Sequence, residues 1–184
     1  INNPNTEEDF ELKLARYRAV STLGLLARGL PAFYINGTFG ADNFLPQEGL
    51  DENRTVNREI FSAQQLWNQL DDERSQQGRV FRMLSELLSV RSNQPAFNPS
   101  APVAVPIDVG DAPLIAALLP AVEENQSLVS VVNLSSSGTE LELTLPAVMG
   151  DKESALNVLT GELCSIQERV VQRDLKPYEV LWLK

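Results

Sequence analysis

The period of the hydrophobic pattern changes once along this chain, and that change limits the folds open to it. Up to about residue 91, apolar residues recur at the three-to-four-residue spacing of amphipathic helices. Over 98–184 they follow the period of two that is typical of strands. Turn residues separate these runs at the intervals of antiparallel strands. We therefore expect an α+β chain whose second part is a small antiparallel β-sandwich.

The helical part contains one short segment of a different kind. Thr6 and Asp9 predict a capped helix start, and this helix should continue to about residue 28, before Gly29. The apolar residues 32–35 follow Pro31 and predict a buried parallel strand, because they are apolar on both faces. Two more helices are expected, over about 62–70 and 75–91.

The second part predicts at least four strands. They are expected over 103–107, 128–134, 141–145 and 180–183. The stretch 93–101 contains Pro and Asn and is the boundary that the composition favours. We therefore divide the chain into 1–94 and 95–184.

Composition excludes several classes of function. The 25 Asp and Glu against 15 Lys and Arg give a net charge of −10, the wrong sign for a partner of nucleic acid or anionic membrane. The chain has no histidine and one cysteine, Cys164, which excludes Ser-His catalysis and Cys/His zinc sites made from this chain alone. The longest apolar stretches are about ten residues, against roughly 20 for a membrane span. We expect a soluble, cytoplasmic protein without metal or cofactor.

Two further features concern the start of the chain and a long loop. The first residue is Ile1, and no signal-like segment precedes the body, which indicates a cut or an internal boundary. The residues 36–60 hold three glycines, one proline and many charged or amide residues. A loop of this length in a compact domain usually has a function. In α/β folds such loops leave the carboxyl ends of strands, where ligands bind.

Several short motifs resemble one enzyme family. They are Gly-Leu-Pro-Ala-Phe-Tyr at 29–34, Asn-Gly at 36–37, Asp-Asn at 42–43, Asn-Arg-Thr-Val-Asn-Arg at 53–58, Pro-Ala-Phe-Asn-Pro at 95–99 and the closing segment 175–183. Together they are similar to the C-terminal portion of sucrose-phosphorylase-like enzymes of the α-amylase superfamily, glycoside hydrolase family 13. The Arg-x-x-Asn-Arg segment points to the phosphorylase branch.

The resemblance implies an architecture and an absence. Residues 1–94 would be the last part of a (β/α)8 barrel, with 32–35 as its eighth strand, and 95–184 the C-terminal β domain. In the family the nucleophile, the acid/base residue and the transition-state-stabilising carboxylate follow earlier barrel strands. Retaining glycosyl transfer needs two carboxyl groups about 5 to 5.5 Å apart, and the carboxylates of this chain offer no such pair. We therefore assign no catalytic residue here and expect the chain alone to be inactive.

The resemblance also implies a set of sugar-binding residues. Arg54 matches an arginine that donates to sugar hydroxyls, a task suited to a planar guanidinium; its alternative role is to pair with a loop carboxylate and order the loop. Asn57 and Arg58 match too, and they either bind substrate or brace the loop. Asn43 matches an Asn after the eighth strand. Tyr34 is assigned to the sugar site, with packing in the barrel core as its alternative.

Three functions stay open at this point. The first is the C-terminal part of a retaining phosphorylase that transfers glucose from an α-glucoside, such as sucrose or a glucosylated small acid, to phosphate. The second makes the parent a hydrolase or transglucosidase. The third is an independent β-sandwich module that binds carbohydrate or a partner, although the strand region lacks an aromatic platform. The expected partners are the glucoside, phosphate, the remaining N-terminal barrel segment and, in a homo-oligomer, a second copy.

Overall fold

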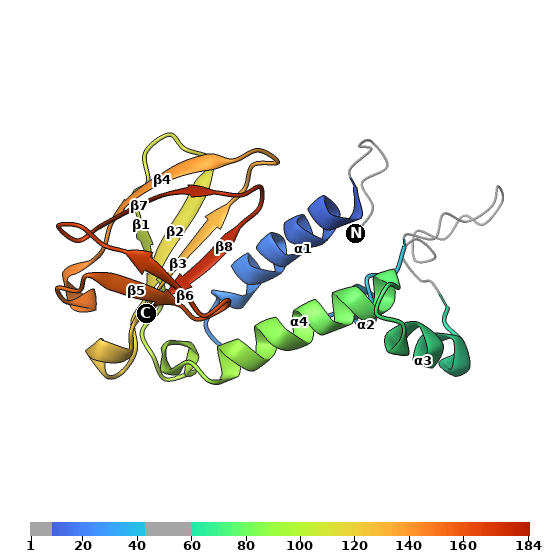
Figure 1. Ribbon diagram of the computed structural model, residues 1–184. Helices are drawn as coiled ribbons and strands as arrows, with labels where there is room; N and C mark the ends of the chain where they lie inside the picture. The colour runs from blue at the N-terminus through green and yellow to red at the C-terminus, as the bar shows by residue number, and fades with distance from the viewer. Residues whose placement is uncertain (1–8, 43–59) are drawn as a thin grey trace, which may run out of the picture. The chain divides into compact units, whose positions relative to one another are not determined.

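The computed structural model describes residues 9–42 and 60–184, in which four α-helices precede eight strands (Figure 1). The chain divides into two compact units. Among the described residues, the first unit contains 9–14, 32–42 and 60–86, and the second contains 15–31 and 87–184. The α+β class and the antiparallel β domain are confirmed. The predicted domain boundary at residue 94, between the last part of a barrel and the β domain, stays a prediction.

The first helix, α1, runs over Phe10–Leu25. Asp9 caps it, because its Oδ1 accepts a hydrogen bond from the amide of Leu12 at 2.8 Å. The helix therefore starts directly after Asp9. The sequence predicted Thr6 as the capping residue, and in the structure Asp9 has this role. Thr6 lies outside the described residues. It also ends about three residues before the predicted end.

The strand predicted at 32–35 is not formed. Residues 32–34 carry no regular structure, Tyr34 has extended dihedral angles, and the short helix α2 spans Ile35–Thr38. A parallel strand needs a neighbour to bond its backbone groups. The described part of the first unit contains no other strand, so nothing holds these residues in a sheet.

The two later helices match their predictions to within one residue. Helix α3 covers Ala63–Asp71 and is capped by Ser62, whose hydroxyl oxygen accepts from the amide of Gln65 at 3.2 Å. Helix α4 covers Gln76–Ser92. The turn between them is tight, because a Cβ added at Gly78 would lie 2.7 Å from the carbonyl oxygen of Asp72. This glycine is therefore required by close backbone approach.

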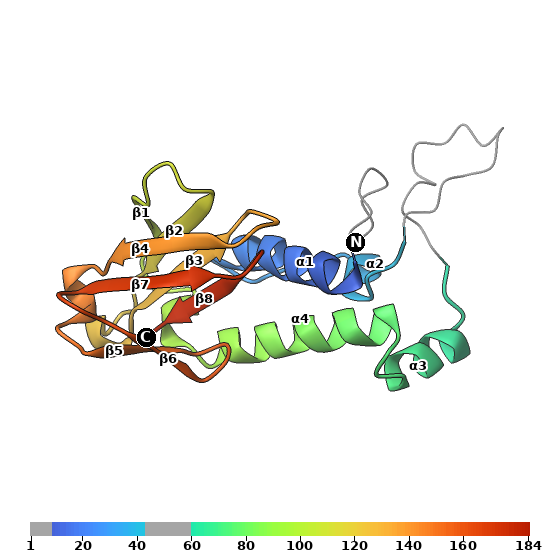
Figure 2. The ribbon, with the colours of Figure 1, turned by 45° about the horizontal axis from the view of Figure 1, so that its top comes forward.

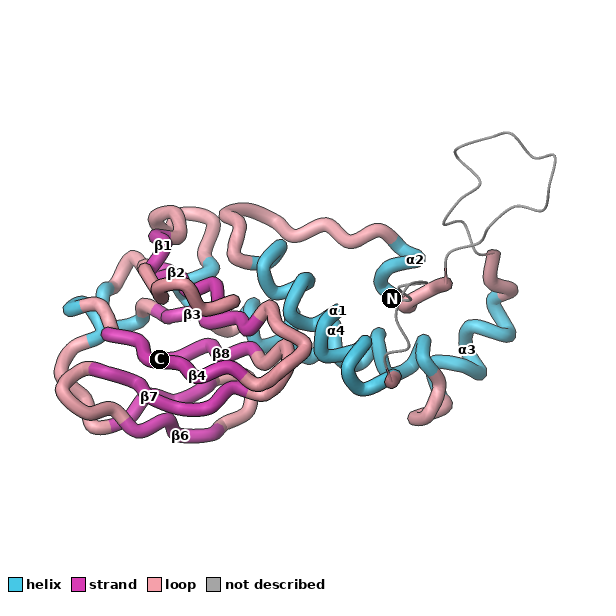
Figure 3. The backbone as a smooth tube through the Cα atoms, turned by 90° about the horizontal axis from the view of Figure 1, so that it is seen from above, coloured by secondary structure: helices cyan, strands magenta, loops and turns pink. Residues whose placement is uncertain are grey.

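All the strands among the described residues lie in the second unit. They are β1 (Val105–Ile107), β2 (Leu114–Leu119), β3 (Leu128–Asn133), β4 (Thr139–Thr144), β5 (Ser154–Asn157), β6 (Glu162–Ser165), β7 (Val170–Leu175) and β8 (Val180–Leu183). Six form one antiparallel sheet in the order β1-β2-β3-β8-β5-β6, and β4 pairs with β7 in a second sheet. Figures 2 and 3 show this pair lying across the larger sheet. The four predicted strands are confirmed as β1, β3, β4 and β8.

The core of the β domain lies between the two sheets. Alternate residues of each strand face it, as the period of two requires. In β4, for example, Leu141 and Leu143 are buried, whereas Glu140 and Glu142 between them are exposed. The central strands β3 and β8 are buried at every position, so their second face is covered as well.

Part of that second face is covered by aromatic and helical residues of the same unit. The rings of Trp182 and Phe97 lie 4.7 Å apart between centroids, and the guanidinium of Arg91 lies 5.0 Å from the Phe97 centroid. Arg91 is buried and donates to the carbonyl oxygens of Leu25 at 3.3 Å and Gly29 at 3.1 Å. It therefore binds the chain at the C-terminal end of α1, where free carbonyls attract a cation.

Candidate functional site

Four of the five predicted sugar-binding residues lie outside the described residues. These are Asn43, Arg54, Asn57 and Arg58, and their roles stay predictions. Tyr34 is described. Its side chain is 61% exposed, and its carbonyl oxygen accepts from the amide of Thr38 at 3.0 Å at the start of α2. Tyr34 is therefore not packed in a core made by the described residues, and its assignment to the sugar site stays a prediction.

The residues on either side of 43–59 contact one another. The rings of Phe39 and Phe61 meet edge to face at 6.3 Å between centroids, and Phe39 lies 5.8 Å from the ring of Phe81 on α4. The side-chain amide of Gln76, at the start of α4, donates to the carbonyl oxygen of Gly40 at 2.7 Å. Helix α4 therefore contacts Phe39 and Gly40, which precede the segment that carries Arg54, and Phe61, which follows it, contacts Phe39.

An ion pair connects the starts of α1 and α4 within the first unit. Arg79 donates to both oxygens of Glu11 at 2.7 Å, and its guanidinium also lies 4.7 Å from the ring centroid of Phe10. The hydrogen bonds from Arg79 hold the pKa of Glu11 below its ordinary value. The same contact raises the pKa of Arg79. Two-point pairing of this kind fixes geometry as well as charge.

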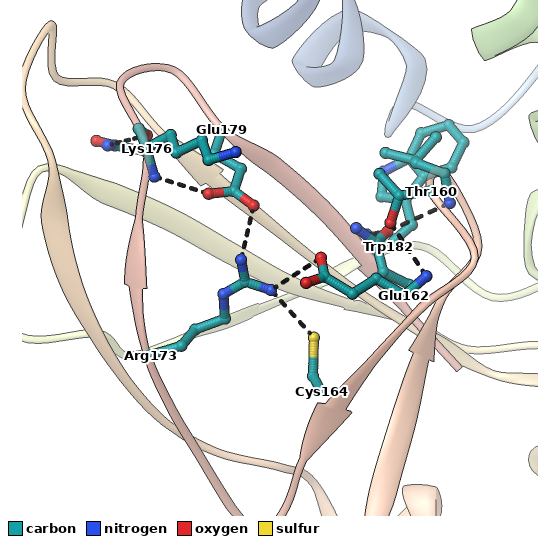
Figure 4. A network of polar contacts seen from close by, with 10 residues as sticks. Thr160, Glu162, Cys164, Arg173, Lys176, Glu179 and Trp182 are labelled. Carbon is teal, nitrogen blue, oxygen red and sulfur yellow. Dashed lines mark hydrogen bonds and ion pairs between the residues drawn. The ribbon is translucent and has the colours of Figure 1, made fainter.

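A second polar network lies in the β domain around Arg173 on β7 (Figure 4). Its guanidinium donates to Glu179 at 3.0 Å and to the sulfur of Cys164 at 3.4 Å, and it lies 3.6 Å from Glu162. The other oxygen of Glu179 accepts from the amide of Lys176 at 2.7 Å. Burial tends to lower the pKa of Arg173, but the contacts with Cys164, Glu179 and Glu162 outweigh it, and the pKa is raised. The network connects the edges of the two sheets.

The alternation of β7 is a sequence signal for this network. Arg173 lies between Val171 and Leu175 in the alternation of β7, and both of these are buried core residues. By the period of two, Arg173 must face inward as well. A half-buried cation on a core face needs acidic partners, so the pattern of β7 by itself indicates carboxylates close to Arg173.

A polar hollow of about 720 Å³ lies on the same domain. It is lined by Glu142, Ser165, Gln167, Glu168, Val170 and Gln172. These residues come from β4, β6, β7 and the hairpin between β6 and β7. The lining has neither aromatic rings nor cations, which separates it from the sugar site that the sequence predicted around Arg54.

Neither metal ligation nor membrane insertion is visible in the described chain. Among residues 9–42 and 60–184, no three His, Cys, Asp or Glu side chains are grouped so as to hold a metal ion. In the same residues no helix has the length and apolarity required to cross a bilayer. Cys164, the only cysteine of the sequence, is a buried free thiol.

Sequence comparison finds relatives with one shared description. A glucosylglycerate phosphorylase of Allomeiothermus silvanus is 36% identical over 105 residues, which are 55% of this chain and 19% of that protein. Glucosylglycerate phosphorylases of Escherichia coli K12 and Spirochaeta thermophila are 24% and 26% identical and match 97% and 95% of this chain. The chain spans 30% of the length of each of these two relatives. No family model matches the chain.

Solved structures share the fold over nearly the whole chain. AmyP in complex with maltose matches 97% of this chain with a TM-score of 0.66 at 16% identity, over 35% of its own length. An Anoxybacillus α-amylase matches 92% with a TM-score of 0.62 at 16% identity, over 32% of its length. Ttha1563 from Thermus thermophilus matches 92% with a TM-score of 0.61 at 21% identity, over 31% of its length. At these identities the matches concern the fold.

Proposed function

We propose that this chain is the C-terminal portion of a longer enzyme, the parent enzyme, and that the parent is a retaining glucosyl phosphorylase. The parent would be a sucrose-phosphorylase-like enzyme of the α-amylase superfamily. The resemblance found in the sequence motifs is confirmed by the sequence relatives and by the shared fold. The observation that carries the proposal is the match of 36% identity to a glucosylglycerate phosphorylase. Because the chain spans less than a third of these relatives, the activity is proposed for the parent.

The relatives favour a glucosylated small acid as the donor. All three are named for glucosylglycerate, whereas sucrose was the other donor that the sequence resemblance allowed. In the proposed reaction a carboxylate of the parent attacks the anomeric carbon, and the glycosidic bond breaks as an acid protonates the leaving oxygen. A phosphate oxygen then attacks the anomeric carbon of the β-glucosyl-enzyme, and the bond to the nucleophilic carboxylate breaks. The phosphate gives its proton to the group that had protonated the leaving oxygen, and α-glucose 1-phosphate forms. The configuration is retained because two inversions follow each other.

Exposed apolar residues of the first unit support a partner segment from the same parent. Ile35 is 57% exposed, Ile60 is 92% exposed and Trp67 is 64% exposed. Helix α3, which carries Trp67, buries none of its residues among those described. Apolar side chains left in water are unfavourable unless another surface covers them. The proposed cover is the N-terminal part of the barrel, which would also supply the catalytic carboxylates.

The test uses the complete parent enzyme with glucosylglycerate and inorganic phosphate. We expect glucose 1-phosphate to form only when phosphate is present, and we expect the 184-residue chain by itself to form none. Release of free glucose at a rate independent of phosphate would instead identify a hydrolase, and formation of a new glucoside without phosphate would identify a transglucosidase. A kcat/KM on sucrose equal to that on glucosylglycerate would overturn the proposed choice of donor.

The proposed role of Arg54 has its own test in the parent. Loss of an arginine that donates to sugar hydroxyls should lower kcat/KM for the donor by about 10- to 100-fold in Arg54→Ala, as expected for one or two hydrogen bonds from a charged group. Arg74→Ala is the control, because Arg74 is exposed and lies outside this loop. Equal kcat/KM values for the two variants would remove Arg54 from the sugar site.

A further inference from the structure

The hollow on the β domain lies where β6 and β7 separate. The two strands are joined by a tight turn, in which Gln167 and Val170 exchange hydrogen bonds at 3.0 and 2.7 Å. The central residues of this turn, Glu168 and Arg169, both have a positive φ. Beyond the turn β6 joins the larger sheet and β7 joins the smaller one, so the strands diverge and leave a wedge between them.

The wedge is lined on one side by β6 and on the other by β7. Both strands have backbone amide and carbonyl groups there that form no hydrogen bond with a neighbouring strand. The amide of Ile166 donates to Glu153 at 2.8 Å, toward β5. Since bonding directions alternate along an antiparallel strand, the backbone of Ser165 faces the other way, into the wedge. On β7, the carbonyl of Arg169 bonds toward β4, and the same alternation turns the backbone of Gln172 away from β4. The wedge therefore offers both amide donors and carbonyl acceptors.

The side chains around the wedge are polar and largely unengaged. In the described chain the side chains of Glu142, Ser165, Gln167 and Glu168 make no hydrogen bond or ion pair. Gln172 uses its amide group once, toward Glu140 at 3.3 Å. The lining thus combines carboxylate acceptors with amide and hydroxyl groups that both donate and accept.

This mixture selects one class of ligand. The lining has two carboxylates and no cation, since the guanidinium of Arg169 donates to the carbonyl oxygen of Leu145, and such a lining disfavours phosphates and carboxylates. With Val170 as its one apolar residue, it does not favour an apolar ligand either. A simple cation would use only the acceptors. A neutral compound with many hydroxyl groups can satisfy donors and acceptors together, and a volume of 720 Å³ lies within the usual range of roughly 300–1,000 Å³ for small-molecule sites.

We propose that the hollow between β6 and β7 is a binding site for a neutral polyhydroxylated ligand, a glycan or a polyol. This site is separate from the proposed glucosyl transfer, whose phosphate and glucose 1-phosphate are anionic. It does not require the parent to be a phosphorylase. Because no aromatic ring lines the hollow, hydrogen bonds carry the affinity, and dissociation constants in the millimolar range follow.

The experiment is a titration of the isotope-labelled 184-residue chain with maltotriose, followed through the backbone amide resonances. We expect saturable shifts at Ser165, Gln167 and Gln172. Glucose 1-phosphate at the same concentrations should leave these resonances in place. In Gln172→Ala the affinity for maltotriose should fall about fivefold, as expected for the loss of one ordinary hydrogen bond.

Asp174→Ala is the matched control, because Asp174 is exposed on the same strand but does not line the hollow. Its affinity for maltotriose should equal that of the unchanged chain, and the amide spectrum of each variant reports whether it has folded. The proposal is overturned if maltotriose produces no saturable shift, if Gln172→Ala and Asp174→Ala bind it equally, or if spermidine moves the same resonances at lower concentration. Failure of this test leaves the phosphorylase assay untouched.

Discussion

Replacing Arg91 by alanine should destabilise the β domain more than its single position suggests. The guanidinium bonds two carbonyls near the end of α1 and lies over Phe97, whose ring contacts Trp182. Arg91→Ala removes all of these contacts together. It also leaves the carbonyl oxygens of Leu25 and Gly29 without this donor.

The magnitude can be worked from these contacts. A hydrogen bond to a charged group contributes about 1.5–3 kcal/mol, and a cation over an aromatic ring adds about 0.5–2 kcal/mol. Two such bonds and one ring contact would contribute about 3.5–8 kcal/mol, but the buried guanidinium gives up hydration, and this cost lowers its pKa. The bond to Leu25 at 3.3 Å is also long. We expect a net loss of about 2–4 kcal/mol in the free energy of unfolding.

Urea unfolding followed by tryptophan fluorescence measures this loss. The chain has two tryptophans, of which Trp182 is fully buried and Trp67 is 64% exposed. In a Trp67→Phe background the signal comes from Trp182 alone and reports on the β domain. Arg28→Ala is the control, because the side chain of exposed Arg28 donates one hydrogen bond, of 2.8 Å, to the carbonyl oxygen of Pro99. The free energy of unfolding lost in Arg28→Ala should stay below about 1 kcal/mol.

The result that refutes the reasoning is a small difference between these variants. If Arg91→Ala lies within about 0.5 kcal/mol of the Arg28 control, the buried contacts contribute no more than a surface arginine. Arg91→Lys gives a further check. It keeps the charge and should recover part of the loss, because an ammonium cannot reach both carbonyls with a planar fork.

Three further predictions concern other parts of the chain. Gly78→Ala should lower the free energy of unfolding by about 1–3 kcal/mol, because the added Cβ meets backbone atoms. Gly24→Ala has open space around its Cβ and should raise the free energy of unfolding by about 0.5–1 kcal/mol. Calorimetry measures both, and equal effects would contradict this prediction. The pKa of Glu11 lies below its ordinary value of 4.5, so its contribution exists above that pH and disappears as the pH falls. The difference in unfolding free energy between the unchanged chain and Glu11→Gln should therefore be complete above about pH 5 and shrink as the pH falls below 4.5, and a constant difference would count against the ion pair. Arg173→Ala should speed the reaction of the single cysteine with a thiol reagent, and an unchanged rate would show that the guanidinium does not shield it.

The parts of the fold that the sequence predicted are those with strong local signals. Helix α3 begins at Ser62 because a cap satisfies free amides wherever it occurs, and β4 alternates cleanly between Glu and Leu. The strand β2 was missed because six consecutive apolar residues, Leu114–Leu119, show no period of two. In the strands β5 and β6 the two apolar residues are adjacent, Ala155 with Leu156 and Leu163 with Cys164, so no period of two is visible there.

The errors have physical causes of the same kind. Residues 32–35 are apolar on both faces, but a strand also needs a partner strand, which a local pattern cannot supply. At the start of α1 two residues could cap, and the structure uses Asp9. For the candidate site, the sequence pointed to Arg54 and its neighbours, which lie outside the described residues. The hollow between β6 and β7 depends on where two strands diverge, and no spacing in the sequence encodes that directly.

The position of β8 has a consequence for how the protein is made. This strand, Val180–Leu183, lies between β3 and β5 and joins the two halves of the larger sheet. The ribosome synthesises β1 to β7 first. The emerging chain therefore has the apolar strand β3 without β8 beside it until β8 is synthesised. The β domain must therefore close after translation of β8, through pairings about 50 residues apart, which form slowly. A message truncated before β8 would yield a chain that exposes a strand edge and invites aggregation.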